Sequence, residues 1–177
     1  MPLKTFCAAC ALILPLGATA QTGVSKADPN RAEVMLARAE RLSGRADYPE
    51  RARLYEQAAR ALARTDRRAS VALFMAASIQ RDLGNAAPAQ HLFVESAEIA
   101  AGRGDLSESA NAYLQALSIA LRRSATSDAR RLIDRILALA NSPRLSEADR
   151  NRIIDRVSRP VGELVPQRLF MVPEGQN

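Results

Sequence analysis

The sequence predicts an all-α fold, a short right-handed α-α superhelix of about three helical hairpins with a C-terminal capping helix. Of the 177 residues, 47% are hydrophobic but only 4% are aromatic, and the abundant Ala, Leu, Arg and Glu favour helices. Apolar residues recur at the spacing i, i+3, i+4, i+7, which places them along one side of a helix. These apolar sets repeat at a period of about 40 residues, which is typical of stacked hairpins.

The first twenty residues are typical of a secretory signal peptide. Lys4 precedes an apolar run over residues 6–17, and the small residues 18–20 follow at the position that a signal peptidase reads. The run is too short to span a bilayer, which needs about 20 residues. We therefore predict cleavage after Ala20 and a periplasmic or secreted protein of a bacterial cell envelope. A buried N-terminal helix and a lipoprotein anchored at Cys10 are the alternatives.

Cleavage after Ala20 would remove both cysteines of the chain, Cys7 and Cys10. The remaining protein would have no disulfide, no thiolate ligand for a metal and no thiol nucleophile. Residues 21–28 are then predicted to form a short linker, and residues 29–158 the helical repeat domain.

Each predicted helix is an apolar stripe bounded by turn residues. The first hairpin turns at Ser43-Gly44, the second at Gly84-Asn85, and the third near Ser124. The expected helices cover residues 29–43, 49–64, 67–83, 87–101, 105–123, 126–141 and 146–158.

Capping signals support several of these boundaries. The stretches 47–50 and 105–108 each read as a capping box that opens the second and the fifth helix. Gly102 and Gly104 are expected to stop the fourth helix. Ser146 is placed to cap the seventh helix, and Pro160 is expected to end it.

Equivalent positions of the three hairpins carry similar apolar residues. Leu36, Phe74 and Leu114 are 38 and 40 residues apart, and a second column at 54, 92 and 132 has Leu throughout with the same spacing. One hairpin cannot bury its apolar stripe alone, so stacking the next hairpin on it extends a single core.

Two stretches, 47–58 and 104–117, carry a local resemblance to tetratricopeptide repeats. The resemblance covers roughly residues 30–142 and is degenerate, because the period exceeds the usual 34 residues or so and Met35 and Leu73 stand where a bulky aromatic is usual. It implies a helical solenoid that acts in protein–protein scaffolding, assembly or chaperoning.

Signals for catalysis are weak, so we predict no enzyme and no cofactor. His91 is the only His, no second His accompanies it as a metal ligand, and no Gly-rich phosphate loop is present. Many carboxylates have an Arg three or four residues away, which indicates surface ion pairs. A hydrolase that uses His91 is the least favoured alternative.

The charge of +6 and the pI near 10.1 leave an electrostatic role open. The aromatic residues do not interleave with basic ones as a nucleic-acid stacking platform requires, so no nucleic acid is expected as a partner. The alternative function is therefore binding of an anionic envelope polymer or of lipid headgroups through Arg-rich faces.

The predicted function is an exported protein-binding adaptor, scaffold or assembly chaperone whose groove is lined by the first helix of each hairpin. The C-terminal tail, 159–177, is predicted to be extended because it contains three prolines, and it either packs back on the last hairpin or serves as a linear docking motif. The candidate partner-binding residues are Glu40, Ser78, Arg81, Asn111, Ser118 and Arg122 in the groove, with Leu169 and Phe170 in the tail.

Overall fold

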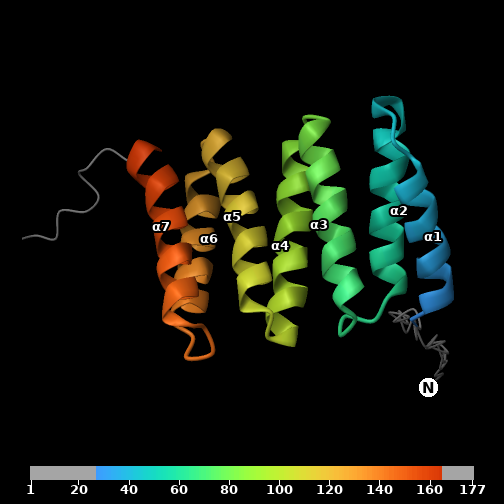
Figure 1. Cartoon of the computed structure of the whole chain (residues 1–177). Coiled ribbons are helices and arrows are strands. Elements are labelled where there is room, and N and C mark those ends of the chain that lie inside the picture. Colours follow the sequence, from blue (N-terminus) through green and yellow to red (C-terminus); the bar gives the residue numbers. More distant parts are fainter. Residues whose placement is uncertain (1–26, 165–177) are drawn as a thin grey trace, which may run out of the picture.

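The computed structural model describes residues 27–164, and these residues form seven α-helices, one 3-10 turn and no strand (Figure 1). The all-α prediction is therefore confirmed for the described part of the chain, and each of the seven expected helices is present. Their bounds are α1 (Pro29–Arg41), α2 (Tyr48–Ala61), α3 (Arg67–Asp82), α4 (Ala86–Arg103), α5 (Leu106–Arg122), α6 (Thr126–Ala140) and α7 (Glu147–Leu164), with the 3-10 turn at Arg45–Asp47.

Each helix packs against the next one along the chain, and α5 also packs against α7. The stack runs from α1 at one end to α7 at the other, as the colours from blue to red show (Figure 1). Within residues 27–164, no helix has both the length and the apolar character that crossing a membrane requires.

The even-numbered helices form one row, which polar side chains link from helix to helix. The guanidinium of Arg60 in α2 donates to Glu95 in α4. Two contacts join α4 to α6: Gln90 donates to Asp128 at 3.0 Å, and Arg135 donates to Glu98 at 2.6 Å.

The odd-numbered helices form the second row in the same way. Arg67, at the start of α3, pairs with Glu108 in α5, and Arg81, near the end of α3, donates to Gln115 at 3.0 Å. On the other side of α5, Arg156 of α7 donates to Asn111 at 3.1 Å. The hairpins therefore stack with equivalent helices beside one another.

The core between the two rows is built largely from alanine, which allows close approach of helices at little entropic cost. Phe93 is the largest fully buried side chain, and it meets the edge of Phe74 with ring centroids 5.0 Å apart and planes at 71°. Nine core alanines within the described residues have no exposed surface: Ala32, Ala39, Ala58, Ala76, Ala77, Ala89, Ala97, Ala116 and Ala120.

Three turn positions adopt a left-handed backbone conformation, whereas Gly44, in the first predicted turn, is extended with φ of −74°. Gly84 follows α3 with φ of 83°, Gly104 follows α4 with φ of 89°, and Ser124 follows α5 with φ of 55°. Glycine adopts this conformation without steric cost, which explains the first two positions. Gly102, expected to help stop the fourth helix, instead lies inside α4.

Both predicted capping boxes are wrong, whereas the Ser146 cap is confirmed. The carboxylate of Asp47 accepts from the Gly44 N–H at 3.2 Å and so caps the preceding 3-10 turn, and it makes no capping bond to α2. The carboxylate of Asp105 is bound by the side chain of Arg103 and makes no capping bond to α5. Ser146 accepts from the Asp149 N–H at 3.1 Å, as predicted.

The expected end of the last helix at Pro160 is also wrong, and residues 159–164 are helical rather than extended. α7 continues through Pro160 to Leu164. A proline removes one donor, the one that would reach the carbonyl four residues earlier, but the residues after it keep their own donors. The predicted signal peptide, residues 21–26 of the linker and the rest of the tail lie outside the described residues.

Candidate functional site

A pocket of about 150 Å³ opens between α3, α4 and α5. Its lining combines an apolar patch with four polar side chains, so it differs from the closed alanine-rich core. The apolar lining residues are Val71, Phe74 and Ala100, and the polar ones are Ser70, Ser96, Glu108 and Asn111.

Small residues on α4 make room for the pocket. Ser96 and Ala100 are one helical turn apart, and both are buried. The hydroxyl of Ser96 donates to the Ser70 carbonyl at 2.7 Å, which fixes α4 against the start of α3. Two such short side chains leave space that the long side chains of an ordinary helix contact would fill.

The apolar patch comes from α3. Val71 is 47% exposed, although it is a β-branched apolar residue. Phe74 is one turn further along, partly buried, and supported from below by the edge contact with Phe93. A valine and a phenylalanine at i and i+3 therefore present a continuous apolar surface at the pocket mouth.

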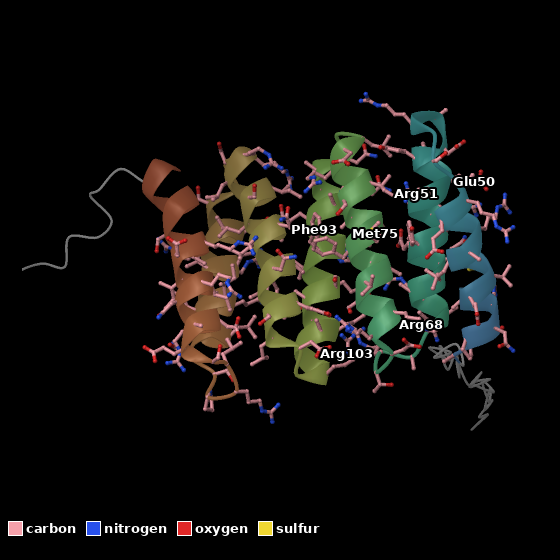
Figure 2. All side chains as sticks on the ribbon, viewed as in Figure 1. Glu50, Arg51, Arg68, Met75, Phe93 and Arg103 are labelled. Atoms are coloured by element: carbon pink, nitrogen blue, oxygen red, sulfur yellow. The ribbon has the colours of Figure 1, made fainter. Side chains whose placement is uncertain are left out.

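Glu108 forms the charged edge of the pocket, and two arginines hold it. Arg67 donates to one of its carboxylate oxygens, and Arg103 donates to the other at 3.3 Å. The side chain of Arg103 is only 11% exposed, and it also bonds Asp105 and donates to the Ser70 hydroxyl at 3.0 Å. Figure 2 shows Arg103 at the same end of the molecule as the start of α3.

A second carboxylate, that of Asp66, lies at the start of α3 beside this network. Asp66 caps α3 by accepting from the Arg68 N–H at 2.9 Å, and the Arg68 guanidinium binds the same carboxylate. These bonds from the Arg68 side chain lower the pKa of Asp66 below its ordinary value. The carbonyl of Asp66 accepts from Arg103 at 3.4 Å, so the cap and the buried arginine belong to one network.

Asn111 is the one candidate groove residue that lines the pocket. Its amide oxygen accepts from Arg156 of α7 at 3.1 Å, and its amide nitrogen is a further donor at the pocket. An amide donor beside an apolar patch suits a backbone carbonyl of a bound chain.

A second pocket, of about 270 Å³, lies at the turn between α4 and α5 and faces the start of α7. It is polar, with an arginine and three carboxylates among its lining residues. These are Gly104, Asp105, Leu106, Ser107, Glu108, Arg144, Leu145 and Asp149. Glu108 borders both pockets, so its two arginines fix the wall between them.

The other groove candidates do not meet in one site. Arg81 reaches Gln115 across the α3–α5 seam, and Ser118 accepts from Arg122 within α5 at 2.7 Å. The hydroxyl of Ser78 donates to the Phe74 carbonyl at 3.0 Å, one turn back in its own helix. Glu40 is exposed on α1, and Leu169 and Phe170 lie outside the described residues.

Most pocket residues were not predicted as site residues from the sequence. Phe74 was assigned to the core, and the periodicity treated Val71 as an ordinary helix position. The sequence contains only weak signals for this pocket. One is a valine that lies outside the buried apolar stripe of α3. The other is a pair of serines, Ser70 and Ser96, at positions that are buried in the structure.

His91 is exposed on α4. Across residues 27–164, no group of three or more His, Cys, Asp or Glu side chains is arranged to hold a metal ion.

The arginine pairs expected to offer a basic face are divided between the two ends of the molecule. Arg67 pairs with Glu108 at the start of α5, whereas Arg122 lies 14 residues further along α5, about 21 Å away. Several of these arginines are also engaged: Arg68 by Asp66, Arg131 by Asp128 and Arg123 by Gln90.

Comparison with family models, curated proteins and solved structures finds no match to this chain.

Proposed function

We propose that this protein is an exported, non-enzymatic adaptor or assembly chaperone that binds a segment of another protein in the pocket between α3, α4 and α5. In this proposal the hairpins form a right-handed superhelix similar to tetratricopeptide repeats, and the signal peptide directs the protein to the periplasm or out of the cell. The observation that carries the proposal is the apolar pair of exposed Val71 and partly buried Phe74 beside the polar edge of the pocket.

The lining chemistry supports recognition of a peptide. A pocket of about 150 Å³ accommodates one apolar side chain of a partner, and binding hot spots are commonly such side chains in desolvated pockets. Around it, the Asn111 amide offers a donor, and the Glu108 carboxylate offers an acceptor for a peptide N–H. An apolar anchor with polar groups at its edge is the usual anatomy of a protein-binding site.

The same groups support binding over catalysis. Both carboxylate oxygens of Glu108 are already engaged, one by Arg67 and the other by Arg103. The serines of the pocket are also engaged, because Ser96 donates to a carbonyl and Ser70 accepts from Arg103 while donating to the Arg67 carbonyl at 2.9 Å.

Affinity capture from envelope extract at low and high salt tests the proposal. The purified chain is compared with Val71→Glu, which puts a charge at the pocket mouth, and with the matched control Val34→Glu. Val34 is 70% exposed on α1, so its substitution adds the same charge at a distant apolar site. Circular dichroism confirms that both variants are folded.

We expect one protein to be retained at both salt concentrations by the parent chain and by Val34→Glu, and lost from Val71→Glu. Apolar contact resists salt, whereas binding through arginines weakens steeply as counterions compete. Retention that disappears at high salt for all three chains would instead indicate an electrostatic binder and would contradict the proposal.

A further inference from the structure

The apolar segment at the C-terminal end of the chain matches the pocket in chemistry. Residues 169–172 are Leu-Phe-Met-Val, a compact apolar run that follows Arg168 and precedes Pro173. The pocket offers Val71 and Phe74 to apolar side chains. The apolar character of the segment therefore fits that of the pocket.

The segment is also long enough to reach the pocket. Arg156 of α7 contacts Asn111 in the pocket lining, and Leu164 lies eight residues beyond Arg156, about 12 Å further along the helix. The pocket lies on the side of α5 that faces away from α7. Packed helices are about 8–10 Å apart, and the pocket is about one and a half such spacings from α7. An extended chain covers about 3.4 Å per residue, so the six residues from Leu164 to Phe170 span about 20 Å.

The distance along α7 and the distance from α7 across to the pocket combine to a separation of about 19 Å. An extended chain from Leu164 just covers this separation at Phe170, and it is longer than the separation at Val172. Pro166 helps, because a proline disfavours helix at the residue before it and so favours a change of direction near residue 165.

We propose that residues 166–173 of the chain fold back toward the pocket between α3, α4 and α5 when no partner is bound, with Phe170 or one of the two apolar residues after it as the anchor in the pocket. The inference rests on the proposed function, because it identifies what a partner must displace. A tethered segment has a local concentration in the millimolar range, so even weak contacts hold it in place. Partner binding is then a competition between two apolar segments for one pocket.

A single tryptophan tests the proposal, because the chain has none of its own. Phe170→Trp places a fluorescent reporter in the segment of the full chain. We expect emission at a shorter wavelength than in the denatured chain and weak quenching by acrylamide. Both properties should be lost when Val71→Glu is added and kept when Val34→Glu is added.

A second pair of variants leaves the helical domain untouched. In the Phe170→Trp chain, Leu169→Glu should shift the emission to the wavelength of the denatured chain, and Gln176→Glu, with the same added charge, should not. A reporter that is fully quenched by acrylamide in the parent chain would overturn the proposal. So would an emission shift that grows with protein concentration, because that result would assign the segment to a second copy.

The tryptophan fluorescence measurement reports on this chain alone, whereas the proposed function is tested by the capture of another protein. A docked reporter with no captured partner would contradict the adaptor role alone. A captured partner with an exposed reporter would overturn the folded-back segment alone.

Discussion

The guanidinium of Arg103, in the last turn of α4, donates a hydrogen bond of 3.0 Å to the hydroxyl of Ser70 in α3. The same side chain bonds Asp105 and Glu108, which open α5. With only 11% of its surface exposed, Arg103 joins three consecutive helices at the edge of the pocket. The geometry of the pocket therefore depends on one buried cation.

Replacing Arg103 with Met should destabilise the protein more than replacing an exposed arginine. The change leaves Glu108 and Asp105 with fewer partners, and hydrogen bonds to charged groups contribute about 1.5–3 kcal/mol each to stability. Urea unfolding measures the loss. Arg130→Met in α6, at an exposed position, is the matched control and should change the free energy of unfolding by less than about 0.5 kcal/mol.

Arg103→Lys distinguishes the hydrogen-bond geometry from the charge. Lysine keeps the charge but lacks the planar fork that reaches two carboxylates and a hydroxyl together. Its stability should fall between those of the parent chain and Arg103→Met. Equal stability of Arg103→Lys and the parent chain would show that the charge alone is sufficient.

Ser96→Ala should cost about 1 kcal/mol of stability, because it removes the donor to the Ser70 carbonyl at the floor of the pocket. Ser107→Ala, at an exposed position in α5, controls for the general effect of a serine-to-alanine change. The measurement is the midpoint of urea unfolding for both variants. A Ser96→Ala chain as stable as the control would mean that the interhelical bond makes no net contribution.

Gly84, in the turn after α3, and Gly102, inside α4, should respond to alanine with opposite signs. Gly84 has φ of 83° and nothing near its Cβ position, so Gly84→Ala pays only the left-handed backbone cost of about 1–2 kcal/mol. Gly102 lies within α4 with open space around it, so Gly102→Ala should stabilise the protein by about 0.5–1 kcal/mol. Thermal unfolding of both variants tests the assigned end of α4 and the turn after α3.

Acid should destabilise the protein partly through Asp66. Hydrogen bonds from Arg68 hold the pKa of Asp66 in the folded state below its unfolded value of about 4. The resulting stabilisation is fully present above that unfolded value and is lost as the pH falls through the lower folded pKa. Asp66→Asn should therefore be less stable at neutral pH and should lose less stability below pH 4.

The control for this pH dependence is Asp28→Asn, which alters a carboxylate that caps α1 through the Arg31 N–H without a paired arginine side chain. Urea unfolding between neutral pH and about pH 3 compares the two variants with the parent chain. An unchanged acid dependence in Asp66→Asn would contradict the assigned role of the Arg68 pair.

The helices were predictable from the sequence because their signal is repeated many times. Stripes such as the one containing Leu73 and Ala77 recur in every helix, and burying them outweighs local preferences. Turn positions such as Gly84 were equally clear, since the left-handed backbone favours glycine.

The predictions that were wrong concern single side chains that have several possible hydrogen-bond partners. Asp47 and Asp105 both have the right residue type for a capping box, but a nearby N–H in one case and Arg103 in the other compete successfully for the carboxylate. Pro160 was expected to end α7, yet a proline removes only one donor and the helix continues.

The pocket was missed for a related reason. The pocket is lined by residues of three helices. The sequence pattern of one helix does not specify how that helix is rotated about its axis relative to its neighbours, and the rotation of α3 relative to α5 is what places Val71 in the lining. Of the six predicted groove residues within the described part of the chain, Asn111 alone lines the pocket. The repeat register predicts that equivalent residues lie along one row of helices, but it does not predict that they meet in one site.

Site-specific crosslinking shows whether a partner protein binds at the pocket between α3 and α5. A photoreactive phenylalanine analogue placed at Val71 is activated in the intact envelope and compared with the same analogue at Val34. We expect one crosslinked protein from position 71 and none from position 34. Equal crosslinking from both positions, or none from position 71 while capture still retains a partner, would contradict binding at this pocket.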